Sequence, residues 1–313
     1  MRSERANFLR RLQAISSACE EPLLVNNADL AHNERAKQLR CGLCVMIFSA
    51  LEDFLRERIS QVLEHLTPAS LPFSSLSQKF QNSASQVALQ SLAFQSQYIE
   101  EDQRLAFLRA EFKKLATVGE NHYSISRFAF SNSKTNVQSS EIFDVLDAFL
   151  VEKPWESIYL TARRLQLATA NPAKQEFEQL ATARHSAAHK QIFDIPSIDL
   201  KAKISSAMSI GVAFDVVLSC AVSNMNSSIA RHQAMRNLKA NDIKVFYVEE
   251  GQYRGKYRLI QEGQPKHRTL LSDPDLSVVK ANGLQKLAVN PGVLVVQDAM
   301  GKPKEWYCRA NGE

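Results

Sequence analysis

One long amphipathic pattern most constrains what this chain of 313 residues can fold into. Between positions 33 and 66, apolar side chains recur at the three- and four-residue intervals of an α-helix. They are Leu39, Leu43, Met46, Ile47, Ala50, Leu51, Phe54, Ile59, Val62 and Leu66. Only 10 glycines and 10 prolines in the whole chain also favour long helices over many turns. We therefore expect a mainly α-helical protein.

Further helices are predicted by the same periodicity at 5–19, 85–117 with a break near Gln97, 140–150, 155–168, 172–193 and 200–228. Residues 69–83 are rich in Ser and Pro and are predicted to form a loop. A polar connection at 119–140 is longer than most in compact domains, and such loops are often functional. Residues 1–235 are thus predicted to form one helical domain.

The composition changes after Ala240, where β-branched and aromatic residues become frequent. Residues 244–250 and 256–262 flank a turn with two glycines and are predicted to form a β-hairpin. Shorter strands are predicted at 284–289, 293–296 and 305–308. Residues 236–313 are therefore expected to form a small β-rich domain, either a twisted sheet or a partly open barrel.

Composition is that of a soluble protein, with 45% hydrophobic and 23% charged residues. No apolar run reaches the roughly 18 residues that span a bilayer. The segment 1–5 has no apolar core and carries an acid early, unlike a signal peptide. We expect a cytoplasmic protein that does not engage a membrane. No Walker or dinucleotide-type glycine loop and no G-x-S-x-G elbow occurs, and no cofactor is expected.

The predicted C-terminal domain is the basic part of the chain. Residues 236–313 hold 13 Lys or Arg against 9 Asp or Glu, or +4 of the formal net charge of +5. Aromatic and basic side chains alternate there, in a pattern that can stack bases and hold phosphates. They are Tyr247, Tyr253, Arg254, Lys256, Tyr257, Arg258, Lys266, His267 and Arg268. A solvated basic surface over an aromatic core accounts for the same pattern.

The segment from Arg184 to His189 interrupts the apolar pattern of the helix predicted at 172–193. Asn171 is expected to cap this helix and Pro172 to fit its first turn. The predicted apolar face holds Phe177, Leu180, Ala181, Ala188 and Ile192, and the predicted wet face holds Gln175, Gln179, Thr182, Ser186 and Lys190. Arg184 and His185 then fall on the apolar face and His189 at its edge. Such violations tend to mark functional sites, because buried polar groups are costly without partners.

Two other interpretations of this segment are open. Arg184, His185 and His189 can be structural residues that are hydrogen-bonded to acids such as Glu178 or Asp194. His185 and His189 also have the H-x3-H spacing of helical zinc ligands. The metalloprotease form of that motif needs Glu after the first His, where this chain has Ser186, and no metal is expected.

The five cysteines are odd in number and scattered, which suits reduced core thiols better than a disulfide framework. Cys41 and Cys44 form a C-x-x-C pair, but inside an apolar helical pattern and without a second pair to complete a zinc site. Helix packing is therefore favoured over redox or metal chemistry for these two residues.

The sequence resembles the HEPN domain family. Arg184-His185-x-x-x-His189 matches the R-x4-H signature of that family, with a polar residue directly after the Arg. The motif lies on a late helix, after a long early helix that carries residues 50–55. The Asn-rich connection before residues 141–149 is similar to that of the HEPN branch found in defence and toxin proteins that process RNA. The resemblance covers about residues 30–225.

The resemblance implies a HEPN-like helical bundle with metal-independent endoribonuclease activity, often at a site shared by two subunits. Carried over by position, Arg184, His185 and His189 would be the catalytic residues. RNA is then the expected partner, and a homodimer, an antitoxin or regulatory partner and a toxin-antitoxin or antiviral defence role are expected. Further candidates for RNA binding are Asn136, Lys190, Arg254, Lys256 and Arg258.

The side chains suit this chemistry, since RNA carries its own nucleophile in the ribose 2'-hydroxyl. Histidine changes charge near neutral pH, so that His189 can act as a general base or acid. Arg184 offers a fork of donors to phosphate oxygens, and His185 lies one helical turn from His189. Two alternatives are a non-catalytic HEPN module that binds nucleotide, RNA or protein, and a helical scaffold whose C-terminal module recognises another protein.

Overall fold

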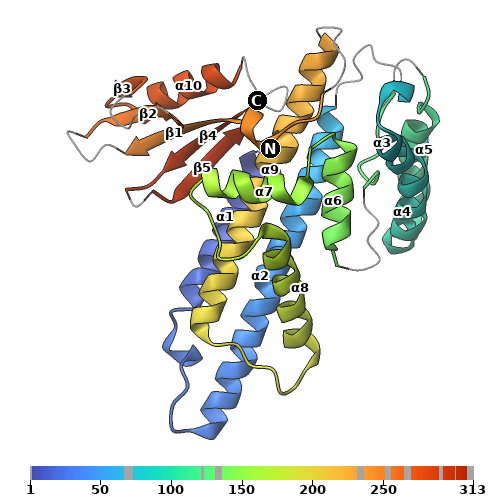
Figure 1. The fold of residues 1–313 in the computed structure, drawn as a ribbon. Coiled ribbons are helices and arrows are strands. Elements are labelled where there is room, and N and C mark those ends of the chain that lie inside the picture. The colour runs from blue at the N-terminus through green and yellow to red at the C-terminus, as the bar shows by residue number, and fades with distance from the viewer. Residues whose placement is uncertain are drawn as a thin grey trace. The chain divides into compact units, whose positions relative to one another are not determined.

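The computed structural model describes residues 2–66, 73–120, 123–130, 136–230, 236–250, 255–263, 269–288, 292–299 and 301–308. It is mainly helical, with a small mixed sheet toward the C-terminus, which confirms the predicted fold class (Figure 1). The chain forms two compact units, residues 1–55 with 158–215 and residues 56–157 with 216–313. The predicted division into domains of residues 1–235 and 236–313 stays a prediction.

The first unit is built around α2 (Leu30–His65), which also extends into the second unit. α1 (Arg2–Ala18) and α8 (Ala173–His189) both pack on α2 through aromatic contacts. The Phe8 and Phe54 rings stack with centroids 4.3 Å apart, and Phe48 meets Phe177 at 5.7 Å. α9 (Ser197–Ala230) approaches closely at Gly211, where an added Cβ would lie 2.7 Å from the Phe8 ring.

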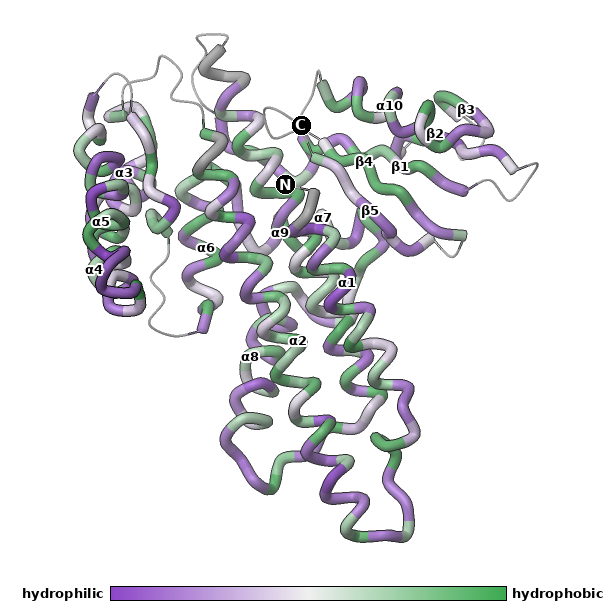
Figure 2. Tube along the Cα trace, turned by 180° about the vertical axis from the view of Figure 1, so that it is seen from behind, coloured by the Kyte–Doolittle hydropathy of each residue, from purple (hydrophilic) through white to green (hydrophobic). Residues whose placement is uncertain are grey.

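The stripe predicted along α2 is buried in part. Ile47, Leu51 and Phe54 belong to the core, and hydrophobic segments recur along the helix between hydrophilic ones (Figure 2). Leu39 and Met46, expected on the same stripe, are exposed by 50% and 53%. They line a shallow apolar hollow of about 310 Å³ together with residues from the end of α1 and the 3-10 helix Pro22–Leu24.

α9 is apolar enough to correct one expectation. By length and composition its segment Ser197–Asn226 suffices to cross a membrane, whereas the sequence was expected to hold no run of that length. In the structure, 83% of the most apolar window of this helix is buried inside the protein. Core helices of soluble proteins pass the same test, and length and composition therefore do not place α9 in a bilayer.

The second unit contains α4 (Ala88–Gln95) and α5 (Glu101–Ala116), separated by an extended residue at Ile99. This confirms the break expected near Gln97. The predicted loop at 69–83 is partly helical, because it contains α3 (Gln78–Asn82), which Ser77 caps by accepting from the Phe80 N–H. α6 (Ser139–Ala148) and α7 (Pro154–Arg164) follow close to the predicted positions.

The sheet has the order β3-β2-β1-β4-β5. Its strands are β1 (Lys244–Glu250), β2 (Tyr257–Gln261), β3 (Leu271–Asp273), β4 (Gly292–Gln297) and β5 (Pro303–Cys308). β1 and β2 form the predicted antiparallel hairpin, with Val248 opposite Leu259. β1 and β4 are parallel, and this pairing requires a crossover between β3 and β4.

That crossover is α10 (Leu276–Leu287), which covers one face of the sheet (Figure 1). A strand was predicted at 284–289, and this prediction is wrong because residues 284–287 belong to α10. The helix begins where Asp275 accepts from the Ser277 N–H. Gly283 lets it lie close to the sheet, since an added Cβ would be 2.6 Å from a Leu294 methyl carbon.

Candidate functional site

The candidate motif occupies the last turns of α8, which is shorter than predicted. The helix runs from Ala173 to His189, and a turn replaces its expected continuation to residue 193. The predicted cap at Asn171 is also wrong, because Pro172 holds the capping position without a side-chain hydrogen bond. Asn171 instead donates from Nδ2 to Glu176 Oε1 at 2.8 Å.

The buried face of α8 differs from the predicted one. Its buried residues are Ala173, Glu176, Phe177, Leu180 and Ser186. Ala188 is exposed and Ile192, beyond the helix, is 92% exposed, although both were placed on the apolar face. Glu176 is tolerated inside because the Ser206 hydroxyl donates to its Oε2 at 2.6 Å. The buried face of α8 thus includes Glu176 and Ser186, and His185 lies outside it.

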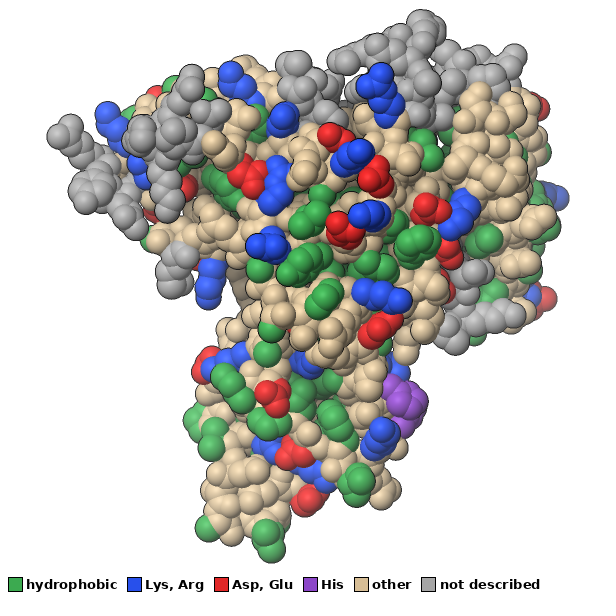
Figure 3. Space-filling model, viewed as in Figure 1, with side chains coloured by type: hydrophobic (Ala, Val, Ile, Leu, Met, Phe, Trp, Pro, Cys, Tyr) green, Lys and Arg blue, Asp and Glu red, His purple; other side chains and the backbone are tan. Residues whose placement is uncertain are grey.

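The three motif side chains therefore lie at or outside the edge of the core. Arg184 is half-buried, and its Nε atom is buried without a hydrogen-bond partner among the described residues. His185 is exposed, which corrects its predicted place on the apolar face, and His189, predicted at the edge of that face, is exposed as well. Their ring centroids lie 4.9 Å apart. Histidine is visible on the surface over α8 in Figure 3. Two exposed imidazoles and one half-buried arginine thus share the end of one helix.

The carboxylates expected under a structural interpretation are engaged elsewhere. Glu178 Oε1 lies 3.7 Å from Lys174 Nζ, and Asp194 is bound by the Arg40 guanidinium. Within the described residues, no hydrogen bond or ion pair joins Arg184, His185 or His189 to an acid. The arrangement leaves these side chains available to an external anion.

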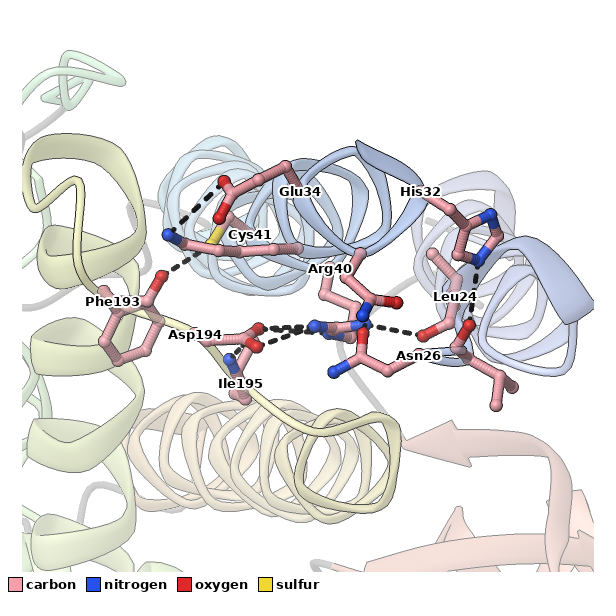
Figure 4. Close-up of polar contacts among 12 residues, drawn as sticks. Leu24, Asn26, His32, Glu34, Arg40, Cys41, Phe193, Asp194 and Ile195 are labelled. Carbon is pink, nitrogen blue, oxygen red and sulfur yellow. Dashed lines mark hydrogen bonds and ion pairs between the residues drawn. The ribbon is translucent and has the colours of Figure 1, made fainter. Parts of the chain in front are cut away.

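The sequence analysis did not predict the polar cluster that Arg40 and Cys41 form with the chain just after the motif. Arg40, 3% exposed, donates to Asp194 and to the Leu24 carbonyl, and the Cys41 thiol donates to the Phe193 carbonyl (Figure 4). Partial burial by itself raises the pKa of Asp194, but hydrogen bonds from Arg40 and from the Ile195 N–H outweigh it and lower that pKa below its ordinary value. In the sequence, the only sign of this cluster is Arg40 itself, an arginine within the apolar stripe of α2.

The candidates for RNA contact are scattered. Lys190 is exposed directly after His189, and Lys256 is exposed before β2. Arg258 is partly occupied, since its Nη2 donates to Glu249 Oε2 at 3.1 Å. Asn136 belongs to the second unit and uses its carbonyl to accept from Gln138. Arg254 lies outside the described residues, as do Asn121, His122 and residues 131–135 of the polar connection.

All five cysteines are buried and free. Burial raises the pKa of the Cys19 and Cys41 thiols and raises that of Cys44 to about 11. A thiol that stays protonated is a poor nucleophile and metal ligand. In the described part of the chain, no three His, Cys, Asp or Glu side chains are grouped so that they could hold a metal ion.

The helical bundle with a half-buried Arg and two exposed His near the end of a late helix defines a HEPN-type domain. The chain belongs to the RiboL-PSP-HEPN family, whose model matches residues 7–219. This match extends the resemblance toward the N-terminus, so that it includes most of α1. No curated protein and no solved structure matches the chain. Membership of the family supports an RNA-related or nuclease role.

Proposed function

We propose that this protein is a metal-independent endoribonuclease with Arg184, His185 and His189 as its catalytic residues. The observation that carries the proposal is the exposed imidazole pair at the end of α8, beside an arginine whose buried Nε has no partner among the described residues. A buried donor without a partner is costly unless a ligand satisfies it. A phosphate oxygen is such a ligand, and Arg binds it through a fork of donors.

In the proposed reaction, His189 removes the proton from a ribose 2'-hydroxyl, and the 2'-oxygen attacks the adjacent phosphorus. The bond from phosphorus to the 5'-oxygen breaks, and a protonated imidazole gives that oxygen its proton. The products are a 2',3'-cyclic phosphate and a free 5'-hydroxyl. Arg184 stabilises the charge that develops on the phosphate, and acid–base assistance contributes about 10²- to 10⁴-fold.

The ring geometry favours a second copy as part of this site. Imidazoles with centroids 4.9 Å apart are in contact, which leaves no space for a phosphate between them. An in-line displacement needs its base and acid on opposite sides of the phosphorus. We therefore propose a homodimer in which the same helix end of a second copy supplies the other proton transfer, while His185 orients its neighbour.

The direct test incubates end-labelled RNA with the protein in EDTA. Fragments with 2',3'-cyclic phosphate ends are expected, with about 10²-fold or greater loss in Arg184→Ala and His189→Ala. Lys174→Ala, at the other end of the same helix, is the control and should cleave normally. Cleavage at the parent rate by His189→Ala would refute the mechanism. Binding without cleavage by the parent protein would favour the non-catalytic alternative.

Mixing the parent protein with an excess of His189→Ala subunits tests the shared site. If each reaction needs the helix ends of both copies, mixed dimers should be inactive, and activity should fall well below the share of parent subunits. Activity that falls only in proportion to that share after verified subunit exchange would argue for independent sites.

A toxin-like role in defence, restrained by an antitoxin or another partner, is a further part of the proposal. Expression in cells should then arrest growth, and His189→Ala should relieve the arrest. The basic C-terminal segment is proposed to add RNA affinity through exposed Lys256. Lys256→Ala should weaken binding and reduce the salt dependence by about one unit of slope.

A further inference from the structure

The C-terminal end of α8 has no strong capping motif of its own. His189 is its last residue, and Lys190 follows in an extended conformation with φ −110° and ψ 110°. The Lys190 N–H still donates to the Ser186 carbonyl at 2.9 Å, but no glycine motif closes the helix. Helix ends open easily when no partner satisfies their last carbonyls. The position of the His189 imidazole therefore depends on the residues that follow.

Residues 190–193 form a turn, and hydrogen bonds bind the end of this turn to α2. The Phe193 N–H donates to the Lys190 carbonyl at 3.0 Å, which closes the turn and leaves Ile192 at its tip. The Cys41 thiol then donates to the Phe193 carbonyl, and Ile195 is buried at 4% exposure. The chain is thus fixed to α2 within a few residues of the imidazole.

Arg40 is the centre of this attachment (Figure 4). Its Nε and Nη2 donate to Asp194 Oδ1 at 3.1 and 2.9 Å, and Nη2 also donates to Oδ2 at 2.7 Å. Its Nη1 donates to the Leu24 carbonyl at 2.6 Å and to Asn26 Oδ1 at 3.0 Å. One planar guanidinium therefore holds two loops at once, which the single ammonium of lysine cannot reproduce.

We propose that Arg40 is a positioning residue for the Arg184–His189 site, acting through Asp194 to hold the end of α8 and with it the His189 imidazole. The inference rests on the proposed ribonuclease function. Arg184 lies more than one turn inside the helix, where intrahelical hydrogen bonds hold it independently. Loss of Arg40 should therefore impair proton transfer by His189 more than phosphate binding by Arg184.

The test compares Arg40→Lys with Arg5→Lys. Both change a buried arginine paired with an aspartate, since Arg5 Nε lies 2.6 Å from Asp215 Oδ2, but Arg5 and Asp215 belong to α1 and α9 and the chain just after the turn is bound by Arg40. Arg40→Lys should lower kcat by about ten- to a hundred-fold, because small misplacements of catalytic groups cost that much. Its RNA dissociation constant should change less than about twofold. Arg5→Lys should lose stability and keep the parent kcat.

Hydrogen exchange of the amides at residues 186–190 gives a readout independent of cleavage. Exchange there should rise in Arg40→Lys and stay unchanged in Arg5→Lys. An unchanged kcat, unchanged exchange at the helix end, or parallel loss of binding and cleavage would each overturn the inference. If the parent protein cuts no RNA, the proposed function fails together with the positioning role. Increased exchange in Arg40→Lys would then still show that the attachment exists.

Discussion

Arg5 and Asp215 meet inside the first unit, where the arginine Nε lies 2.6 Å from the aspartate Oδ2 and joins α1 to α9. Their side chains are 4% and 0% exposed. The carboxylate is thus fully removed from water and depends on its partners for solvation. A buried pair of this kind makes the fold sensitive to the loss of either member.

Asp215→Ala is expected to lower the free energy of unfolding by about 3–5 kcal/mol, because it removes one member of a buried ion pair. Urea unfolding measures this loss. The double variant Arg5→Met with Asp215→Leu removes both charges and should be much closer to the parent. Equal losses in the single and double variants would contradict this interpretation.

His185 and His189 should differ in their effect on the pH dependence of cleavage. The proposed reaction needs one neutral and one protonated imidazole, which gives a bell-shaped profile of rate against pH. His189→Ala removes this imidazole from both copies and should abolish both limbs of the profile and most of the rate, whereas His185→Ala should lower the rate and keep both limbs. Initial rates across the neutral range provide the measurement. A two-limbed profile in the His189 variant would exclude it as a proton-transfer group.

Asp194 should make stability depend on pH in the acid range. The pKa of this carboxyl is lower in the folded protein, although partial burial opposes the shift, because Arg40 and the Ile195 N–H bind its charged form. Its contribution is therefore complete above the unfolded value of about 4 and is lost as the pH falls through the lower folded value.

Asp194→Asn should accordingly be less stable than the parent at neutral pH, and the two should converge in acid. Thermal unfolding at a series of pH values checks this. A difference in stability that stays constant down to the acid transition would show that the charge of Asp194 is not involved.

Gly283 and Gly42 offer a matched pair of helical glycines. A Cβ at Gly283 would lie 2.6 Å from the side chain of Leu294, a fully buried residue of β4, whereas a Cβ at Gly42 meets nothing within 4 Å. Gly283→Ala should cost about 1–3 kcal/mol through overpacking. Gly42→Ala should gain up to about 1 kcal/mol from helix propensity. Stabilisation by both would show that α10 can move away from the sheet.

Periodicity was sufficient to predict the long helices that precede the sheet, because their apolar side chains recur along continuous segments. It was not sufficient for the orientation of α8. Glu176 is a charged residue in the sequence, and its burial is permitted by hydrogen bonds from Asn171 and from Ser206, thirty positions later. The predicted apolar face therefore included His185, which the structure exposes. The burial of Glu176 depends on a partner that is distant in the sequence, and local patterns do not predict such a partner.

The same limit explains α10 and the Arg40 attachment. The β-branched Val278 and Val279 are more typical of strands than of helices, Gly283 lowers helix propensity, and α10 is stabilised by packing on the sheet. Asp194 was considered as a partner for the motif, whereas Arg40, 154 positions away, binds it. The residue types of the candidate site could be identified from the sequence, but the groups that hold them could not.

The five buried cysteines have a practical consequence. Because burial keeps the thiols of Cys19, Cys41 and Cys44 protonated, thiol-directed labels should react slowly with the native protein. A fluorophore could then be attached to a single cysteine introduced at Gln191, without removing the native ones. Such a reporter would follow movement at the end of α8 while RNA binds.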